Sequence, residues 1–346
     1  MTNTNLVKNN ELFFNARNKI PQKTPPIWFM RQAGRYHKHY QALRAKHSFE
    51  ILCRNPELAA QVALGPIQDF DFDVSILFSD LLFPLDAMGM KLSYSDAGPH
   101  LEHSLAKGYQ LTGYNHDKAL TELQFQSQAL KITREMLPQN KSLIGFVGGF
   151  WTLYVYAAEG GHAGSLIPAK SLYPKSQEFV KALIELIEGN IQQQLNAGAE
   201  VVMVFDTSAG EVSSQFYKEQ IAPTLIKWAH KFPHKLGYYS KGTQPSFFTP
   251  EFLSAPWAGR GVDHRWNIVE AVKTSQAGFI QGNFDQAMLF QETRDFKKTL
   301  GTYISAMKEL SIEERAGWVC GLGHGVLPKT PEHHVKYFIE TIRAEF

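Results

Sequence analysis

Cysteine is scarce in this chain of 346 residues, which contains only Cys53 and Cys320. Two cysteines provide no disulfide framework, so we expect reduced thiols and a cytoplasmic protein. Long hydrophobic runs are also missing, and none reaches the roughly 20 residues that a membrane-spanning helix needs. The N-terminal residues are polar and lack the apolar stretch of a secretory signal. These absences predict a protein without a membrane partner.

An excess of charge of either sign is absent as well. The chain has 35 Lys and Arg against 33 Asp and Glu, which gives a formal net charge of +2. A dedicated nucleic-acid binder usually carries a strongly basic domain, so we expect no nucleic-acid partner. Its 44% hydrophobic and 20% charged residues are typical of a globular enzyme.

Against this neutral background, one segment is strongly basic. Residues 28–36 read WFMRQAGRY and place Arg31 and Arg35 four residues apart across a Gly-containing turn. Between Arg31 and Phe49 lie five Lys or Arg and three His, but no Asp or Glu. A guanidinium group can grip a carboxylate or phosphate with two parallel hydrogen bonds. The segment therefore predicts a clamp for a polyanion; the alternative is that both arginines pair with acids on the surface.

Short β-like runs alternate with helical stretches along the chain. The runs are 26–30, 74–78, 143–147, 200–205, 235–239, 261–266, 278–282 and 317–321. Alternating strands and helices imply a parallel sheet with right-handed crossovers. Eight units predict an α/β protein with a single (β/α)8 TIM barrel over residues 1–346, in which 1–11 form a flexible tail. A doubly wound open sheet is the structural alternative.

Helical periodicity is clearest in four stretches. Residues 56–70 follow a capping Asn55 with a proline at the first position. Residues 175–197 and 331–343 each place apolar side chains along one stripe, and a further helix is expected over 117–137. The Gly-, Ser- and His-rich stretch 93–113 is expected to be an irregular surface excursion.

In barrels of this kind, chemistry takes place on the loops at the carboxyl ends of the strands. Unusual polar residues fall at those positions and are expected to share one open face. They are Arg31, Arg35, Ser79, Asp80, Asp206, Thr207, Ser240, Lys241, Asp263, His264, Asn283, Asp285 and His324, with Tyr156 in the passage from loop to helix after the third strand.

Asp80 is the most informative carboxylate because it lies within the apolar run ILFSDLLFP. Burying a carboxylate without a partner is costly. Asp80 therefore either caps the next helix, pairs with Arg31 or Arg35, or faces a cationic or N–H-rich ligand. His324 lies in GLGHG, which is either a tight turn or a backbone that approaches a ligand closely. Taken alone, Thr207 could be a helix cap and Tyr156 a core residue.

Cofactor and metal signals are weak. The glycine-rich residues 145–149 lack the patterns that hold nucleotide phosphates. A zinc site needs three or four converging ligands, and no His-x-Cys motif follows the fifth strand to join Cys320. Cys53 is expected to be a small buried hydrophobic residue. We expect neither a metal nor a cofactor.

Taken together, the motifs resemble the uroporphyrinogen decarboxylase family. They are PIWFMRQAGRY at 26–36, FSD at 78–80, WTL at 151–153 leading to Tyr156 and Glu159-Gly160, FDT at 205–207 and LGHG at 322–325. The resemblance runs from about residue 12 to the C-terminus. It implies a (β/α)8 barrel, a homodimer, no cofactor, and removal of the four acetate carboxylates of uroporphyrinogen III as CO2. It also implies a set of substrate-binding residues: Arg31, Gln32, Ala33, Gly34, Arg35, Asp80, Tyr156, Thr207 and His324.

The resemblance implies catalytic roles for Asp80 and Arg31. Asp80 would accept the pyrrole N–H groups and stabilise the cation that forms as CO2 departs. Arg31 would place the reacting acetate and donate a proton, although a guanidinium is a poor acid and His324, Tyr156 or a water is chemically easier. Departures from the family pattern occur at Gly149-Phe150, Ser208-Ala209, Asp263-His264 and 282–286, and are expected to alter pocket walls.

Three rival interpretations remain. A related family on the same barrel transfers methyl groups from corrinoid proteins using zinc, which the missing His-x-Cys disfavours. A non-catalytic tetrapyrrole-binding paralogue would bind the ligand without releasing CO2. A polyanion- or RNA-binding role for residues 31–47 is disfavoured by the neutral charge of the whole chain.

Overall fold

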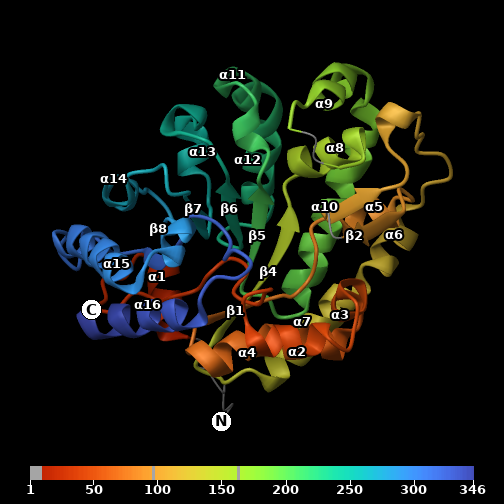
Figure 1. Ribbon diagram of the computed structural model, residues 1–346. Helices are drawn as coiled ribbons and strands as arrows, with labels where there is room; N and C mark the ends of the chain where they lie inside the picture. The colour runs from red at the N-terminus through yellow and green to blue at the C-terminus, as the bar shows by residue number, and fades with distance from the viewer. Residues whose placement is uncertain (1–9, 96–97, 162–163) are drawn as a thin grey trace, which may run out of the picture.

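A parallel β-sheet forms the centre of the molecule, with helices packed around it (Figure 1). The structure, a computed structural model, describes residues 10–95, 98–161 and 164–346. The seven strands of the sheet are β1 (Val74–Ile76), β4 (Ser142–Gly148), β5 (Val201–Asp206), β6 (Leu236–Ser240), β7 (Gly259–Gly261), β8 (Phe279–Phe284) and β9 (Trp318–Leu322). Every neighbouring pair is parallel.

The order of the strands excludes the doubly wound alternative. A doubly wound sheet reverses its strand order at a switch point. Here the order β1-β4-β5-β6-β7-β8-β9 follows the chain without a reversal. Buried runs such as VVMVF in β5 suit strands that are covered on both faces. The α/β class is confirmed, and six of the eight expected strands lie within two residues of their predicted positions.

The expected first strand, 26–30, is reduced to a single bridge between Ile27 and Cys320. The segment still has backbone hydrogen bonds on both sides. Cys320 N donates to Pro26 O (2.9 Å) and Trp28 N donates to Cys320 O (3.3 Å) on the β9 side, while Asp73 N donates to Ile27 O (3.0 Å) on the β1 side. Residues 26–30 therefore lie between the two outer strands of the sheet.

The expected strand at 261–266 is wrong, because β7 ends where that run begins. Turn chemistry explains the difference, since a short Asp side chain competes for backbone donors. Asp263 Oδ1 accepts from Arg265 N (2.9 Å), Asp263 Oδ2 accepts from Gly242 N (2.7 Å), and Trp266 N donates to Asp263 O (3.1 Å). These bonds turn the chain out of the sheet.

Three of the expected helices are confirmed as α4 (Pro56–Phe70), α10 (Gln177–Asn196) and α16 (Glu332–Glu345). The helix expected over 117–137 is broken at Leu123 into α6 (His116–Glu122) and α7 (Gln124–Met136). The stretch expected to be irregular contains the antiparallel pair β2 (Leu92–Ser95) and β3 (Gly98–Leu101). The other α-helices are α1 (Glu11–Arg17), α2 (Lys38–Arg44), α3 (Phe49–Arg54), α5 (Phe83–Ala87), α8 (Phe150–Glu159), α9 (Ile167–Leu172), α11 (Ser214–Phe216), α12 (Ala222–Lys231), α13 (Pro250–Ser254), α14 (Ile268–Lys273) and α15 (Thr293–Lys308).

A flexible tail was expected for 1–11, and residues 1–9 lie outside the described part. Asn10 is buried and its side chain accepts from Phe13 N (2.7 Å), so it caps α1 rather than belonging to a tail. Among the described residues, no helix is long and apolar enough to cross a membrane.

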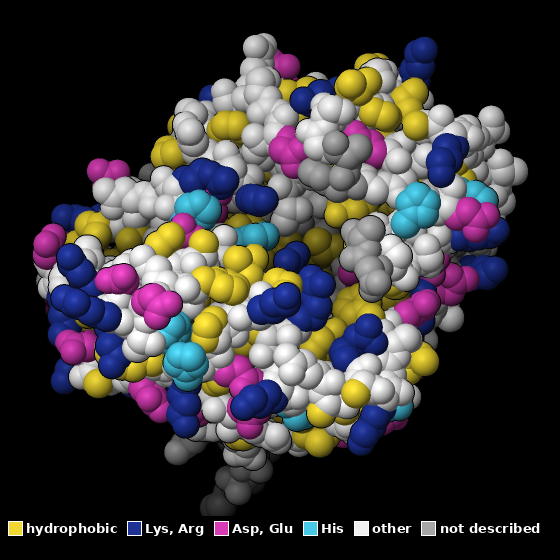
Figure 2. All heavy atoms as spheres, in the orientation of Figure 1, with side chains coloured by type: hydrophobic (Ala, Val, Ile, Leu, Met, Phe, Trp, Pro, Cys, Tyr) yellow, Lys and Arg dark blue, Asp and Glu magenta, His cyan; other side chains and the backbone are white. Residues whose placement is uncertain are grey.

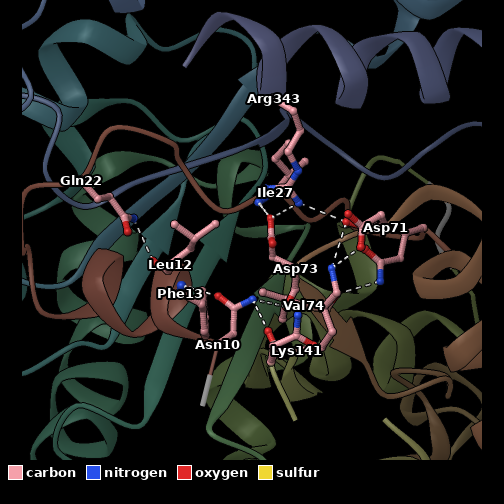
Figure 3. A network of polar contacts seen from close by, with 12 residues as sticks. Asn10, Leu12, Phe13, Gln22, Ile27, Asp71, Asp73, Val74, Lys141 and Arg343 are labelled. Atoms are coloured by element: carbon pink, nitrogen blue, oxygen red, sulfur yellow. Dashed lines mark hydrogen bonds and ion pairs between the residues drawn. The ribbon is translucent and has the colours of Figure 1, made fainter. Parts of the chain in front are cut away.

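A polar network holds the segment 26–30 at the amino ends of the strands (Figure 3). The buried Asp73 carboxylate accepts from Ile27 N (2.7 Å) and from Arg343 Nη2 of α16 (2.8 Å). Asn10 Nδ2 donates to Asp73 O (3.2 Å), which adds α1 to the network. Burial raises the pKa of Asp73, while Arg343 opposes that shift. The network thus joins the first and last helices to the sheet at the end opposite the polar loops.

Candidate active site

Five candidate residues come from separate loops or helices that follow the strands. Arg31 follows the segment 26–30, Asp80 lies four residues beyond β1, Thr207 directly follows β5, and His324 lies two residues beyond β9. Tyr156 lies inside α8, beyond the expected passage from loop to helix. The carboxyl ends of parallel strands meet at one edge, so these residues share a face. Figure 2 shows that this surface is hollowed near the middle and that Lys, Arg and His side chains gather around the hollow.

Arg31 is the residue that connects the candidates. Its positive charge acts on Asp80, Tyr156 and His324, which places all three in its electrostatic neighbourhood. Arg31 has a left-handed backbone with φ +60°. The missing side chain of Gly325 makes room for it, because a Cβ there would lie 2.5 Å from Arg31 Cδ.

The basic turn contains exposed arginines and a buried glutamine. Arg31 and Arg35 are exposed, and within 10–95, 98–161 and 164–346 neither forms an ion pair with an acid. Gln32 instead is buried; its Nε2 donates to Val74 O (2.9 Å) and its Oε1 accepts from Phe29 N (3.2 Å). Gln32 therefore uses its side chain to hold the turn against β1. Ala33 and Gly34 are partly buried beside it.

Asp80 is partly buried, and one of its oxygens stabilises the local turn. Its Oδ1 accepts from Leu82 N (2.8 Å), which stabilises the turn before α5. Burial raises the pKa of Asp80, whereas the Leu82 amide, the Arg31 charge and the nearby Tyr94 hydroxyl lower it. The Tyr94 hydroxyl is buried, and no described residue lies within hydrogen-bonding geometry of it. Asp80 thus has a positive charge and a phenol beside it.

His324 is held by a single tyrosine. Tyr239 Oη lies 3.0 Å from His324 Nδ1 and 2.9 Å from Gly323 O, and the two rings stack with 13° between their planes. Burial lowers the pKa of His324 to about 4, with the charges of Arg31 and Lys241 acting in the same direction. His324 is therefore a neutral imidazole at neutral pH.

Asp206 lies next to Thr207 but faces the interior. Its Oδ1 accepts from Thr152 N (3.1 Å) and from Thr152 Oγ1 (2.5 Å), and burial raises its pKa to about 6. Gly149 packs against it so closely that a Cβ would lie 2.5 Å from Asp206 Cγ. Asp206 supports the loop, while Thr207 is the partly buried residue that follows at the strand end.

Sequence reasoning placed Lys241 and His264 on this face but outside the site. Both act on the pKa of His324, so the structure brings them to it. Tyr239 and Tyr94 were missed altogether. Tyr239 had one available signal, since it is the last-but-one residue of a strand that leads to the polar face; Tyr94 had none, because its stretch was expected to be irregular.

The part of the chain that the structure describes contains no group of three or more His, Cys, Asp or Glu that could hold a metal ion. Cys53 and Cys320 are buried and unpaired. Burial raises the pKa of both thiols. Cys53 is thus a small buried residue, as expected.

The fold and the candidate site define a class of α/β protein in which loops at the carboxyl ends of parallel strands bring Arg31 close to the carboxylate of Asp80 and to the neutral imidazole of His324. The sequence model of the family described as uroporphyrinogen decarboxylase (URO-D) matches residues 8–345, so the chain belongs to that family.

Relatives of known name agree with this assignment. The chain is 32% identical over 340 residues to the uroporphyrinogen decarboxylase of Solibacter usitatus (strain Ellin6076), covering 96% of each chain. It is 30% identical to that of Koribacter versatilis (strain Ellin345), covering 94% of each. Among solved structures, it resembles a methyltransferase from Methanosarcina mazei with a TM-score of 0.76 and 18% identity, covering 97% of this chain and 98% of that one. Such low identity shows a shared fold only.

Proposed function

We propose that this protein converts uroporphyrinogen III to coproporphyrinogen III by removing its four acetate carboxylates as CO2, without a cofactor. Membership of the family over nearly the whole chain supports the reaction. The observation that carries the mechanism is the partly buried Asp80 beside Arg31, on the same face as Tyr156 and His324.

Substrate binding follows from charge. Uroporphyrinogen carries four acetates and four propionates, so it is a compact polyanion with eight carboxylates. Arg31 and Arg35 have no acidic partner within the described residues and remain available to bind these groups. Lys241 adds a further positive charge close to His324.

Asp80 is proposed to act on the centre of the ring. The four pyrrole N–H groups converge there and can donate to one carboxylate. Protonation of a pyrrole carbon makes the ring cationic, and CO2 leaves as its bonding electrons move into that ring. Asp80 stabilises the cation more than the neutral ring, which is the differential binding that accelerates a reaction.

Protons balance over each cycle. One proton adds to the pyrrole carbon, and CO2 departs to leave an exocyclic methylene carbon. A second proton adds to this methylene carbon and produces the methyl group. The pyrrole carbon then loses the first proton. Each decarboxylation thus consumes one proton. Arg31 is proposed to orient the reacting acetate, with Tyr156 and Thr207 lining the site.

Three further features are proposed: a closed barrel, a single domain and a homodimer. Residues 26–30 complete a closed eight-membered barrel, supported by their hydrogen bonds to both outer strands. The chain forms one domain, and it functions as a cytoplasmic homodimer, which sedimentation of the purified protein would test.

The deciding experiment is incubation of the purified protein with uroporphyrinogen III, followed by separation of the products by number of carboxylates. We expect intermediates with seven, six and five carboxylates and a final product with four. Binding of the porphyrinogen without release of CO2 would instead favour the non-catalytic paralogue.

Asp80→Asn is the matching variant. An asparagine Oδ1 can still accept from Leu82 N, so the turn is retained. We expect kcat to fall by about 10²–10³-fold, the usual loss for one preorganised electrostatic group, while the ligand still binds. Asp117→Asn removes an exposed carboxylate from α6 and serves as the control. Near-normal turnover by Asp80→Asn would remove this mechanism.

A further inference from the structure

Tyr239 has a position that the proposed reaction does not yet use. It is fully buried on β6, and its ring lies against Phe205 with centroids 6.1 Å apart. Its hydroxyl lies between two groups of the loop after β9, the carbonyl oxygen of Gly323 and the Nδ1 of His324. Tyr239 therefore connects β6 to the loop that carries His324.

The tyrosine hydroxyl has only one proton to donate. Gly323 O can only accept, so the Tyr239 proton satisfies it at 2.9 Å. The Tyr239 oxygen is then an acceptor for His324 Nδ1, at 3.0 Å. This arrangement makes two hydrogen bonds, whereas the opposite one makes a single bond and leaves the Gly323 carbonyl without a donor. The hydrogen-bond count therefore favours a proton on Nδ1.

The other ring nitrogen is open. His324 is only partly buried, its Nε2 makes no hydrogen bond with a described residue, and this atom is not among the fully buried polar atoms. The glycines on both sides of His324 are closely packed against neighbouring residues. A Cβ on Gly323 would lie 3.0 Å from His264 Cα, and one on Gly325 would lie 2.5 Å from Arg31 Cδ.

We propose that Tyr239 is a positioning residue, which holds neutral His324 in the Nδ1–H form and leaves Nε2 as the open basic atom that faces the ligand. The inference deepens the proposed function and rests on it only for the identity of that ligand.

The charged residues around His324 act on its pKa. Arg31, Lys241 and His264 oppose protonation of His324, and Asp263 favours it, while burial acts most strongly and keeps the pKa near 4. A ligand with eight carboxylates acts against the contributions of Arg31 and Lys241, although burial, the largest cause, remains.

The direct test is nitrogen NMR of the free, full-length protein labelled with ¹⁵N-histidine, at pH 7. Comparison with His324→Gln assigns the His324 signals. We expect a protonated Nδ1 and an unprotonated Nε2. A protonated Nε2 in the unsubstituted protein would overturn the proposal without any Tyr239 variant. This readout is independent of decarboxylation, so its failure is distinguishable from failure of the proposed function.

Tyr239→Phe keeps the ring and removes the oxygen. We expect a mixture of the two neutral forms at His324, together with a fall in kcat of about tenfold and little change in KM, as for the loss of one hydrogen bond. Tyr238→Phe is the matched control, because the neighbouring hydroxyl accepts from Tyr217 Oη (3.1 Å) and donates to Asp206 Oδ2 (3.5 Å), and makes no hydrogen bond to His324. The control should leave the His324 signals unchanged. An unaltered His324 spectrum in Tyr239→Phe would also overturn the proposal.

Discussion

Asp80 and Asp206 look alike in the sequence, since each follows an apolar run that leads to the same face. Their surroundings separate them. Asp206 is fully buried with both Thr152 donors on one oxygen, whereas Asp80 is partly exposed and lies beside Arg31. Thr152 lies 54 residues from Asp206, so local sequence could not distinguish the supporting carboxylate from the candidate catalytic one.

Asp206 makes the stability of the fold depend on pH. Burial raises its pKa from 3.8 to about 6, so the folded state holds the proton more tightly than the unfolded state. Its stabilising contribution is complete below about pH 4 and is lost as pH rises through about 6, on the order of 3 kcal/mol in total.

We therefore expect Asp206→Asn to become more stable relative to the unsubstituted protein as pH rises from about 4 to 7. Urea unfolding at several pH values measures the difference, with the exposed Asp117→Asn as the control. Parallel stability curves for Asp206→Asn and the parent protein would contradict the prediction.

The segment 26–30 shows how an element can be held in place by groups outside itself. Its apolar pattern predicts a strand, yet only Ile27 forms a bridge. The Asp73 carboxylate accepts from Ile27 N, as a backbone carbonyl of a partner strand would. The guanidinium of Arg343 pairs with the Asp73 carboxylate. The strand predicted at 261–266 is absent for a different reason, because Asp263 diverts the chain into a turn after β7.

Removing Arg343 should weaken this anchor. We expect Arg343→Ala to lower the free energy of unfolding by about 1–3 kcal/mol, because the buried Asp73 loses its partner. Lys336→Ala on the same helix is the control; its pair with Glu340 is exposed and spans 3.9 Å, so its loss should change stability by less than about 0.5 kcal/mol. Denaturant unfolding compares the two, and equal effects would argue against the anchor.

For the whole molecule, hydrogen exchange tests whether residues 26–30 close the sheet into a barrel. If residues 26–30 complete the barrel, their amides should open only when the protein unfolds globally. We expect hydrogen exchange at Trp28 and Cys320 to be as slow as at Val202 in β5, whose amide donates to Lys235 O (2.9 Å). Exchange at Trp28 faster by more than about a hundredfold would indicate an open sheet edge.

Much of the architecture could be predicted from local patterns. Continuous apolar runs located β5 and β9, and the stripe through Phe179, Leu183 and Ile187 located α10, because burial on both faces or on one stripe leaves a periodic signal. Tyr94 could not be found this way. Its strand belongs to a short hairpin, and its approach to Asp80 depends on packing between distant segments.

The amino-acid order alone established the class of fold, the basic turn around Arg31 and Arg35, and the family, because each depends on residues that are neighbours in the chain. Folding settled which side chains act together. Gln32 turns inward while Arg31 stays open, and Tyr239 reaches a histidine 85 residues away. Such pairings depend on how strands and loops come together in space, and that geometry leaves no periodic or local trace in the sequence.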